Sequence, residues 1–389
     1  MRIIAIITSI ATVTGCSSSP RPAGDDDDVP DAGSGTADSG EDPAPATEDC
    51  TRYPYRAETL YAERLGFGRN TTGGDWAMPY HVTTLADAGP GSLREALESP
   101  NPYWIVFDVE GVIDLGEAVH PLSNKTVDGR GRDITIDGNL KLDAGTRNMI
   151  FSDVKLQYVE GWEAQDGDII SIRGNGHDDP EQYDSRDMWF HHLELGRGGD
   201  GQLDNRGATY VTISWTHLHS HNKAMLHTND TEQLPSRGNR TTYHHNFFDR
   251  VSRRGPQFHW GLGDFFNNYQ YQWYEYGAAP QQGAKFLSQS NIYEARPGEY
   301  CYCPDPNNPA GDMDIEVSKV ALTPQWDTEP GYIKSVGDVT REGAVITQRE
   351  PQLVFDRAAH YDAVVDPADD ALVEALKTKT GPRRDYCGD

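Results

Sequence analysis

Four aspartates in two close groups are the residues of this chain best suited to binding a cation. Asp166 and Asp168 are separated by one glycine, and Asp200 and Asp204 follow as a second group. Residues two apart on a strand share a face, so the first two carboxylates would point the same way. If the next stretch of chain lies alongside, all four carboxylates would form the oxygen site that Ca²⁺ prefers. Taken alone, the Asp166–Asp168 pair is also typical of a turn.

Histidines form a second concentration of chemically active side chains. Nine of the 13 histidines lie between His191 and His259, which raises the question of a zinc site. His191–His192 and His244–His245 are adjacent pairs, and neighbours on a strand point to opposite faces, so only alternate members would converge on one metal ion. Surface imidazoles and a stacked polar ladder explain them more simply than zinc does.

The elements that must position these residues repeat along the chain. Between about residues 123 and 294, short apolar alternations recur, and each ends in a polar residue followed by a large apolar one. The steps are Asp153-Val154, His192-Leu193, His217-Leu218, Asn246-Phe247, Asn268-Tyr269 and Asn291-Ile292. Loose repeats of β-rich units indicate a solenoid, and we expect an all-β fold, a right-handed, single-stranded parallel β-helix. The six polar residues would form a ladder at one turn of stacked coils.

Two helices are expected to flank the solenoid. Residues 91–98 contain a capping box of Ser92 and Glu95, and this helix would cover the N-terminal end of the core. Residues 366–376, in a C-terminal extension, contain an Asp cap, Pro367 at the first helical position and an apolar stripe of alanine and leucine. This second helix would pack on the side of the solenoid.

Composition sets the class of protein and of partner. The chain has 389 residues, of which 36% are hydrophobic, so a sizeable core is possible. The net charge of −27 argues against nucleic acid as a partner, because duplexes reward clustered Lys and Arg. Residues 17–49 hold ten acids, one arginine and many Pro, Gly, Ser and Ala, so we expect a disordered linker there. Residues 50–389 would be one domain.

The first 16 residues are typical of an export signal. Arg2 precedes an apolar run over residues 3–13, which is too short to span a bilayer. The run ends in Val-Thr-Gly-Cys16, which resembles a bacterial lipobox and implies cleavage before Cys16 and lipidation of its sulfur. With Ser17 next, the resemblance implies an exported lipoprotein of the outer membrane or cell surface. An ordinary cleaved signal peptide with a chance cysteine is the alternative.

The remaining cysteines number four, which favours two disulfides in an exported protein. Cys301 and Cys303 are too close in sequence to pair easily with each other. We expect each to reach one of the terminal cysteines, Cys50 and Cys387, and the pairing stays open.

Several segments together resemble the family 1 pectate lyases, including the plant-like branch. They are GFGRNTTGG at 66–74, GSLR at 91–94, KTVDGRG at 125–131, DGDIISI at 166–172, VTIS at 211–214 and NNY at 267–269, and they occur in the family's order. The resemblance covers about residues 66–293. It implies β-elimination of polygalacturonate or pectin, in which the C5 proton is removed and the glycosidic oxygen leaves C4.

The resemblance also implies the cofactor. Asp166, Asp168, Asp200 and Asp204 match the family's calcium ligands. A carboxylate next to C5 makes that carbon a poor acid, and a cation bound to the carboxylate would stabilise the developing negative charge. We therefore expect a calcium-dependent enzyme.

The base implied by the resemblance is Arg254, in an Arg-x-Pro segment that matches the family's. Because a free guanidinium stays protonated far above neutral pH, an arginine acts as a base only where cations and burial favour its neutral form. The positive charges of calcium and of Lys223, which matches a substrate-binding lysine of the family, would favour the neutral form of Arg254. Arg253 is the alternative candidate, and the spacing to Pro256 favours Arg254.

One position departs from the family pattern. His259 stands where the family usually has a second arginine that binds a substrate carboxylate, and Gln257 stands where plant-like members carry arginine. A histidine is charged only below about pH 6.5, so anion affinity at His259 would weaken or depend on pH. A partly methyl-esterified substrate, lost activity, or a packing role for His259 would each fit.

Three alternative functions are compatible with the same solenoid. A pectin lyase, which acts without calcium, would lack the aspartates, and a polygalacturonase-type hydrolase would need a tight carboxylate cluster without the Arg-x-Pro segment. A non-catalytic polysaccharide binder could keep the aspartates and lose the base. We expect a monomeric, calcium-dependent pectate lyase that is anchored by lipid at Cys16.

Overall fold

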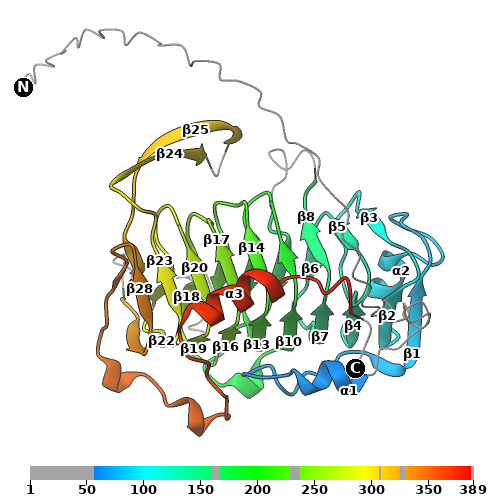
Figure 1. The fold of residues 1–389 in the computed structure, drawn as a ribbon. Coiled ribbons are helices and arrows are strands. Elements are labelled where there is room, and N and C mark those ends of the chain that lie inside the picture. The colour runs from blue at the N-terminus through cyan, green and yellow to red at the C-terminus, as the bar shows by residue number, and fades with distance from the viewer. Residues whose placement is uncertain (1–56, 160–166, 228–236, 306–307, 325–328, 387–389) are drawn as a thin grey trace, which may run out of the picture. The chain divides into compact units, whose positions relative to one another are not determined.

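The computed structural model describes residues 57–159, 167–227, 237–305, 308–324 and 329–386. In these residues, strands from successive turns of the chain stack in parallel into three sheets, and a complete coil gives one strand to each sheet (Figure 1). The coil that carries β13, β14 and β15 is one example. The parallel β-helix that the sequence repeats predicted is thereby confirmed.

The ten-stranded sheet of the described residues contains β1 (Asp75–Val82), β2 (Tyr103–Phe107), β4 (Lys125–Asp128), β7 (Arg147–Ser152), β10 (Ser185–His191), β13 (Ala208–Ser214), β16 (Arg240–His244), β19 (Leu262–Phe266), β22 (Lys285–Gln289) and β27 (Tyr332–Val336). The nine-stranded sheet contains β3 (Gly111–Asp114), β5 (Ile134–Asp137), β8 (Lys155–Gln157), β11 (Glu194–Leu195), β14 (His217–His219), β17 (Phe247–Asp249), β20 (Tyr269–Tyr271), β23 (Ile292–Glu294) and β28 (Val339–Arg341).

The six-stranded sheet, which carries the candidate site, contains β6 (Leu140–Leu142), β9 (Ile170–Arg173), β12 (Leu203–Arg206), β15 (Met225–His227), β18 (Gln257–His259) and β21 (Ala279–Gln281). Smaller described elements are the antiparallel pair β24 (Tyr300–Asp305) and β25 (Asn308–Glu316), the parallel pair β26 (Val320–Leu322) and β29 (Val345–Ile346), and the 3₁₀ turns Pro180–Gln182, Pro351–Leu353 and Arg357–Ala359.

The core lies inside the coils, where alternate residues of each strand point inward. Equivalent positions stack on one another, as Phe151 does on Phe190 with ring centroids 5.7 Å apart. Ile172 and Leu203 of the six-stranded sheet belong to the same buried cluster. Outward positions of that sheet are therefore left for polar residues such as Asp204, one residue beyond Leu203.

A polar ladder runs along one turn, but its members differ from those expected. Asn268 accepts from the backbone N–H of Asn246 at 3.0 Å, and Asn291 accepts from that of Asn268 at 2.8 Å. Thr216 and Asp338 continue the ladder at its two ends. The three asparagines are confirmed as ladder residues.

The expected ladder positions of Asp153, His192 and His217 were wrong by one residue. Asp153 accepts hydrogen bonds from the backbone and side chain of Arg383. In the coil of His192, the ladder position belongs to the next residue, Leu193, whose side chain lies in the core. His217 stands opposite Phe247 and stacks on its ring. A left-handed residue precedes the ladder position in these coils and in the asparagine coils alike. In the earlier coils the ladder position itself holds Val154, Leu193 or Thr216, so the polar-to-apolar step falls one residue away from it.

The two flanking helices are present. In α2 (Leu93–Glu98), Ser92 caps Glu95 N, and Leu93, Ala96 and Leu97 join the core, so the expected N-terminal cover is confirmed. A short helix, α1 (Ala57–Ala62), precedes it.

The C-terminal helix α3 (Asp370–Lys379) begins later than expected. Its cap is Asp369, because Asp366 instead binds Asn267 and His245. Leu372 and Leu376 pack on the outer face of the nine-stranded sheet, as expected, together with Val373 rather than with the predicted alanines.

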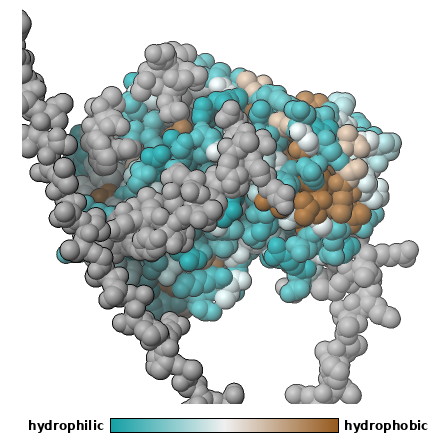
Figure 2. Space-filling model, turned by 90° about the horizontal axis from the view of Figure 1, so that it is seen from above, coloured by the Kyte–Doolittle hydropathy of each residue, from teal (hydrophilic) through white to brown (hydrophobic). Residues whose placement is uncertain are grey.

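The surface seen in Figure 2 is mostly hydrophilic. Hydrophobic residues gather toward the end of the molecule that carries β1 and β3, where Met78 and Val112 are exposed. Among the described residues, no helix is long and apolar enough to span a membrane. The expected signal segment with Cys16, the linker, Cys50 and Cys387 lie outside the described residues, and so do the side chains of Cys301 and Cys303.

Candidate functional site

Three of the four predicted cation ligands come together at the start of the strands of the six-stranded sheet. Asp168 lies just before β9, while Asp200 precedes β12 and Asp204 lies within it. β9 and β12 are paired in register, so the turns that precede them are stacked. One carboxylate oxygen of each aspartate lies within 4.8 Å of the others. Asp166 lies outside the described residues.

The buried carboxylates have oxygen atoms that nothing in the described protein satisfies. Asp168 and Asp204 are 3% and 1% exposed, and the Oδ1 atom of each is buried without a hydrogen-bond partner. Burial, together with the charge of Asp204, raises the pKa of Asp168 to about 6. Burial also raises the pKa of Asp204. Anionic oxygens this poorly compensated fit a bound cation.

A glycine leaves room beside these oxygens. A Cβ atom on Gly201 would lie 2.8 Å from Asp168 Oδ1 and 3.4 Å from Asp204 Oδ1. A side chain at this position would therefore fill the space that the two carboxylates face. The donor set of carboxylates, without sulfur or imidazole, suits a hard ion such as calcium.

Three cationic side chains balance the three acids. Lys223 forms an ion pair with Asp200, and Arg206 donates to Asp204 Oδ2 at 2.9 Å. Burial acts to raise the pKa of Asp200, but the hydrogen bond and charge of Lys223 outweigh it and lower that pKa. Lys223 is thus placed at the edge of the acidic cluster, where it can contact an anionic ligand.

Arg254 is the third cation and lies just before β18. Its backbone is left-handed, with φ of 61°, and its carbonyl accepts from Met225 N at 2.7 Å. The side chain is half-buried, its Nε has no partner among the described residues, and its charge acts on Asp200 and Asp204. Arg253, the alternative candidate, is bound to Glu275 at 3.0 Å. These contacts leave the Arg254 guanidinium available at the site.

His259 belongs to a neutral group on the next coils. It is 4% exposed, its Nε2 lies 3.2 Å from Gln257 Nε2, and Tyr276 donates to Gln257 Oε1 at 3.2 Å. Burial and the charge of Arg254 lower the pKa of His259 to about 4. This lowered pKa favours a neutral imidazole near neutral pH, and the expected change of charge stays a prediction.

Sequence reasoning missed two residues of this site, Arg206 and Gly201. Arg206 lies two residues after Asp204 on the same strand, so the period of two could have placed it on the same face. Gly201 gave no such signal, because its role depends on the stacking of two coils.

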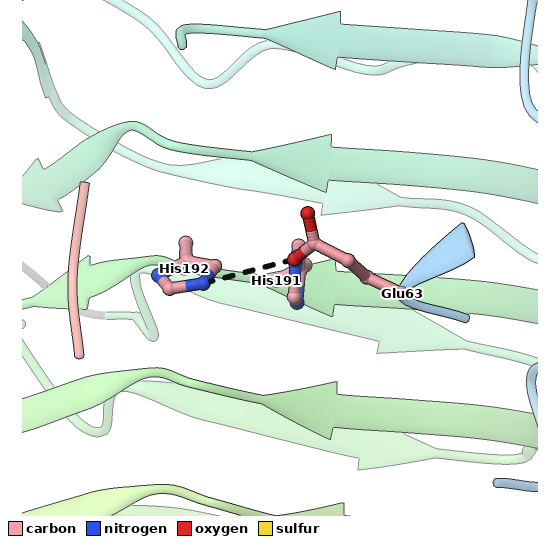
Figure 3. A group of neighbouring side chains, drawn as sticks. All are labelled: Glu63, His191 and His192. Carbon is pink, nitrogen blue, oxygen red and sulfur yellow. Dashed lines mark hydrogen bonds and ion pairs between the residues drawn. The ribbon is translucent and has the colours of Figure 1, made fainter. Parts of the chain in front are cut away.

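A second cluster joins Glu63, His191 and His192 (Figure 3). His191 Nε2 lies 2.8 Å from Glu63 Oε2, and His192 Nε2 lies 4.0 Å from the same oxygen. The expectation that adjacent histidines diverge was wrong here, because His192 has a left-handed φ of 48° at the end of β10. That turn brings the second imidazole back toward the first.

The fold and the acidic site together define a parallel β-helix with an oxygen-ligand cation site on one sheet. A family profile described as pectate lyase matches residues 117–311. The chain belongs to the pectate lyase family.

Individual relatives agree with this assignment. The chain is 31% identical to the "Probable pectate lyase P56" of Solanum lycopersicum, over 62% of this chain and 66% of that protein. It is 31% identical to a "Pectate lyase" of Nicotiana tabacum, over 59% of this chain and 62% of that protein. The chain thus spans less than two thirds of the length of these relatives.

Solved structures share the fold. The major allergen jun a 1 from cedar pollen superposes with a TM-score of 0.65 at 22% identity, over 86% of this chain and 98% of that one. Pectate lyase II from Xanthomonas campestris superposes with a TM-score of 0.60 at 20% identity, over 82% and 98%.

Proposed function

We propose that this protein is a pectate lyase that cleaves (1→4)-α-D-galacturonan by calcium-dependent β-elimination and releases unsaturated oligogalacturonides. The observation that carries the proposal is the buried pair of unsatisfied carboxylate oxygens on Asp168 and Asp204, beside the available guanidinium of Arg254. Membership of the pectate lyase family supports the same reaction.

Asp168, Asp200 and Asp204 would hold the calcium, and Asp166 is proposed as a fourth ligand. When bound, the ion would withdraw charge from the galacturonate carboxylate and so make the C5 proton more acidic. The stacked coils beneath the aspartates support the proposal, because a site carried by paired strands is held in place before its ligand binds.

Arg254 is proposed to take the C5 proton. Its left-handed backbone turns the residue out of the regular strand, and the bond from Met225 N holds it there. Strained backbone of this kind is retained where the surrounding structure imposes it, often at functional sites. Proton removal at C5 and loss of the C4 oxygen would leave a C4–C5 double bond on the new chain end.

Lys223 is proposed to bind substrate. Its ammonium group is paired with Asp200 in the described structure. Once a divalent cation neutralises the aspartates, the lysine can exchange that partner for a galacturonate carboxylate at little cost, since both partners are carboxylates. Lys223 would thus join metal binding to polymer binding.

His259 favours a variant of this function on partly methyl-esterified pectin. The group of Gln257, His259 and Tyr276 offers hydrogen bonds but no positive charge at neutral pH. A site of this kind accepts a neutral ester more readily than a site built around a fixed arginine charge. The pectin activity is the second candidate.

The proposed activity is tested by the ultraviolet absorbance of unsaturated product from polygalacturonate, with calcium and with a chelator. We expect product only with calcium. Full activity in chelator would overturn the calcium role, and activity on methylated polymer alone would favour a pectin lyase. Arg253→Lys is the matched control for Arg254→Lys, because Arg253 is held by Glu275. The control should retain activity.

We further propose that the enzyme is exported as a lipoprotein and is anchored through Cys16 at the outer membrane or cell surface. We also propose that residues 50–389 form its lyase domain and that it acts as a monomer. The Val-Thr-Gly-Cys16 motif and the polar composition of residues 17–49 support the anchor and tether. Metabolic labelling with a radioactive fatty acid tests this: wild type should be labelled and Cys16→Ala should not. Equal labelling of both proteins would contradict the anchor.

A further inference from the structure

The cluster of Glu63, His191 and His192 is separate from the proposed lyase site and joins distant parts of the chain. Glu63 follows α1, and the two histidines end β10 and begin the turn after it. Gly381 and Arg383 of the C-terminal segment contact the same residues. The lyase chemistry proposed above uses none of these five residues.

The hydrogen bonds of His192 place two acceptors face to face. The Nδ1 of His192 lies 3.0 Å from the carbonyl oxygen of Gly381, which can only accept, so Nδ1 carries the proton. In this tautomer the lone pair of the ring lies on Nε2. That lone pair faces Glu63 Oε2 at 4.0 Å. A cation between these two atoms would turn an unfavourable contact into two bonds.

His191 already bonds to Glu63. Its Nε2 lies 2.8 Å from Glu63 Oε2, which can only accept, so Nε2 carries the proton. Ser214 Oγ accepts from Trp189 Nε1 at 2.9 Å and lies 2.9 Å from His191 Nδ1, so its hydroxyl can donate to that nitrogen. A metal ion would replace the Nε2 proton, because a histidine binds metal only in its deprotonated form. His191 is fully buried, so its ring is held firmly in this orientation.

Charge and space at the cluster allow an ion. Arg383 Nη1 donates to both oxygens of Glu63, at 2.8 Å to Oε1 and 3.0 Å to Oε2, and the same guanidinium forms two bonds with Asp153. The charge of Arg383 is thus shared between two carboxylates, and Glu63 Oε2 contacts Arg383 as well as the imidazoles. His192 and Glu63 line a cavity of about 1080 Å³, which gives an ion a route to these two side chains.

We propose that Glu63, His191 and His192 bind a divalent transition-metal ion of the zinc type. All three ligand atoms lie within 4.8 Å of one another. A tetrahedral zinc ion with ligands at about 2.0–2.1 Å separates two ligand atoms by about 3.3 Å, and the two imidazoles lie 2.8 Å and 4.0 Å from Glu63 Oε2, on either side of that value. Two imidazoles and one carboxylate select zinc over calcium, whereas the acidic site selects the reverse.

Bound metal would fasten the residue after α1 to the end of β10, next to the C-terminal segment that contacts both. A ligand that binds only the folded state stabilises it by mass action. At free zinc about 100 times the dissociation constant, the folding equilibrium constant rises about 100-fold.

The test is zinc titration of the full chain in saturating calcium, so that the acidic site is already filled. Wild type should bind one equivalent by calorimetry, and its melting temperature should rise. His192→Gln should lose both effects, while His120→Gln, at an exposed histidine paired with Asp143, should keep them. Circular dichroism verifies that the variants are folded.

Substitution of Co²⁺ for Zn²⁺ gives a readout on wild type alone, should a variant fail to fold. We expect the visible absorption of cobalt coordinated by imidazole, and its loss on addition of excess zinc. A wild type that shows neither the cobalt spectrum nor a zinc-dependent melting shift would overturn the site. A shift that persists in His192→Gln would also overturn it, as binding elsewhere.

Discussion

Replacing Asp168 by asparagine should stabilise the protein when no divalent cation is present. Asp168 has an ordinary pKa of 3.8 that burial and Asp204 raise to about 6. The folded state therefore holds this proton more tightly than the unfolded chain does. The contribution of Asp168 to stability is therefore greatest below about pH 4 and is lost as the pH rises from about 4 to about 6, because folding must then bury a charge.

The size of the effect follows from the shift. About two pKa units correspond to roughly 3 kcal/mol, and for a domain of this size that amounts to about 4 °C in melting temperature. Asparagine removes the charge and can still accept the bond that Ser171 donates to Asp168 Oδ2 at 2.9 Å. Asp168→Asn should thus melt about 4 °C higher than wild type at about pH 8 in chelator, and equally near pH 4.

Thermal unfolding followed by circular dichroism measures this difference. Added calcium should stabilise wild type and leave Asp168→Asn unchanged, and the variant should have no lyase activity. Asp128→Asn is the control, because Asp128 is paired with buried Arg130 and its loss should destabilise by about 3–5 kcal/mol with or without calcium. If Asp168→Asn melts below wild type in chelator at high pH, Asp168 is a structural residue and the reasoning fails.

Three further substitutions test the site from other sides. Arg254→Lys should lower turnover by several orders of magnitude with little change in polymer affinity, and steady-state kinetics measure both. A loss of polymer affinity as large as the loss of turnover would contradict the role of Arg254 as the base. Gly201→Ala should weaken calcium binding measured by calorimetry, because its Cβ would lie 2.8 Å from Asp168 Oδ1, and unchanged affinity would remove the glycine from the site. His259→Arg should lower the Michaelis constant for de-esterified polymer. In wild type, the pKa of His259 is about 4, so its Michaelis constant should not change through titration of His259 between about pH 6 and 9. If wild type and His259→Arg have the same Michaelis constant on polymer of low ester content and the same one on polymer of high ester content, His259 does not contact the substrate.

Much of the fold could be predicted because a stacked solenoid repeats a local pattern. The asparagine steps at Asn246, Asn268 and Asn291 marked equivalent positions correctly, and the ladder bonds explain why. Asp153 and His192 were misaligned by one residue, because Val154 and Leu193 occupy the ladder position there and the polar residue before each of them imitates the asparagine step. The left-handed bend before the ladder recurs in the asparagine coils as well, so it does not distinguish the two cases.

The candidate site was predictable to the extent that it depends on register. Asp168, Asp200 and Asp204 converge because parallel coils stack equivalent turns. Gly201 was missed because its importance lies in the space left between coils. The convergence of His191 and His192 was missed because a left-handed residue cancels the alternation on which the prediction relied.

The nature of the products tests the central proposal most directly. β-Elimination creates one C4–C5 double bond for every glycosidic bond cleaved, whereas hydrolysis creates none. Proton NMR and a reducing-end assay on digested polygalacturonate, with calcium present, measure both ends in one sample. We predict one unsaturated end for each new reducing end, and neither in chelator. New reducing ends without unsaturated ends, or no cleavage at all in calcium, would contradict the proposed lyase.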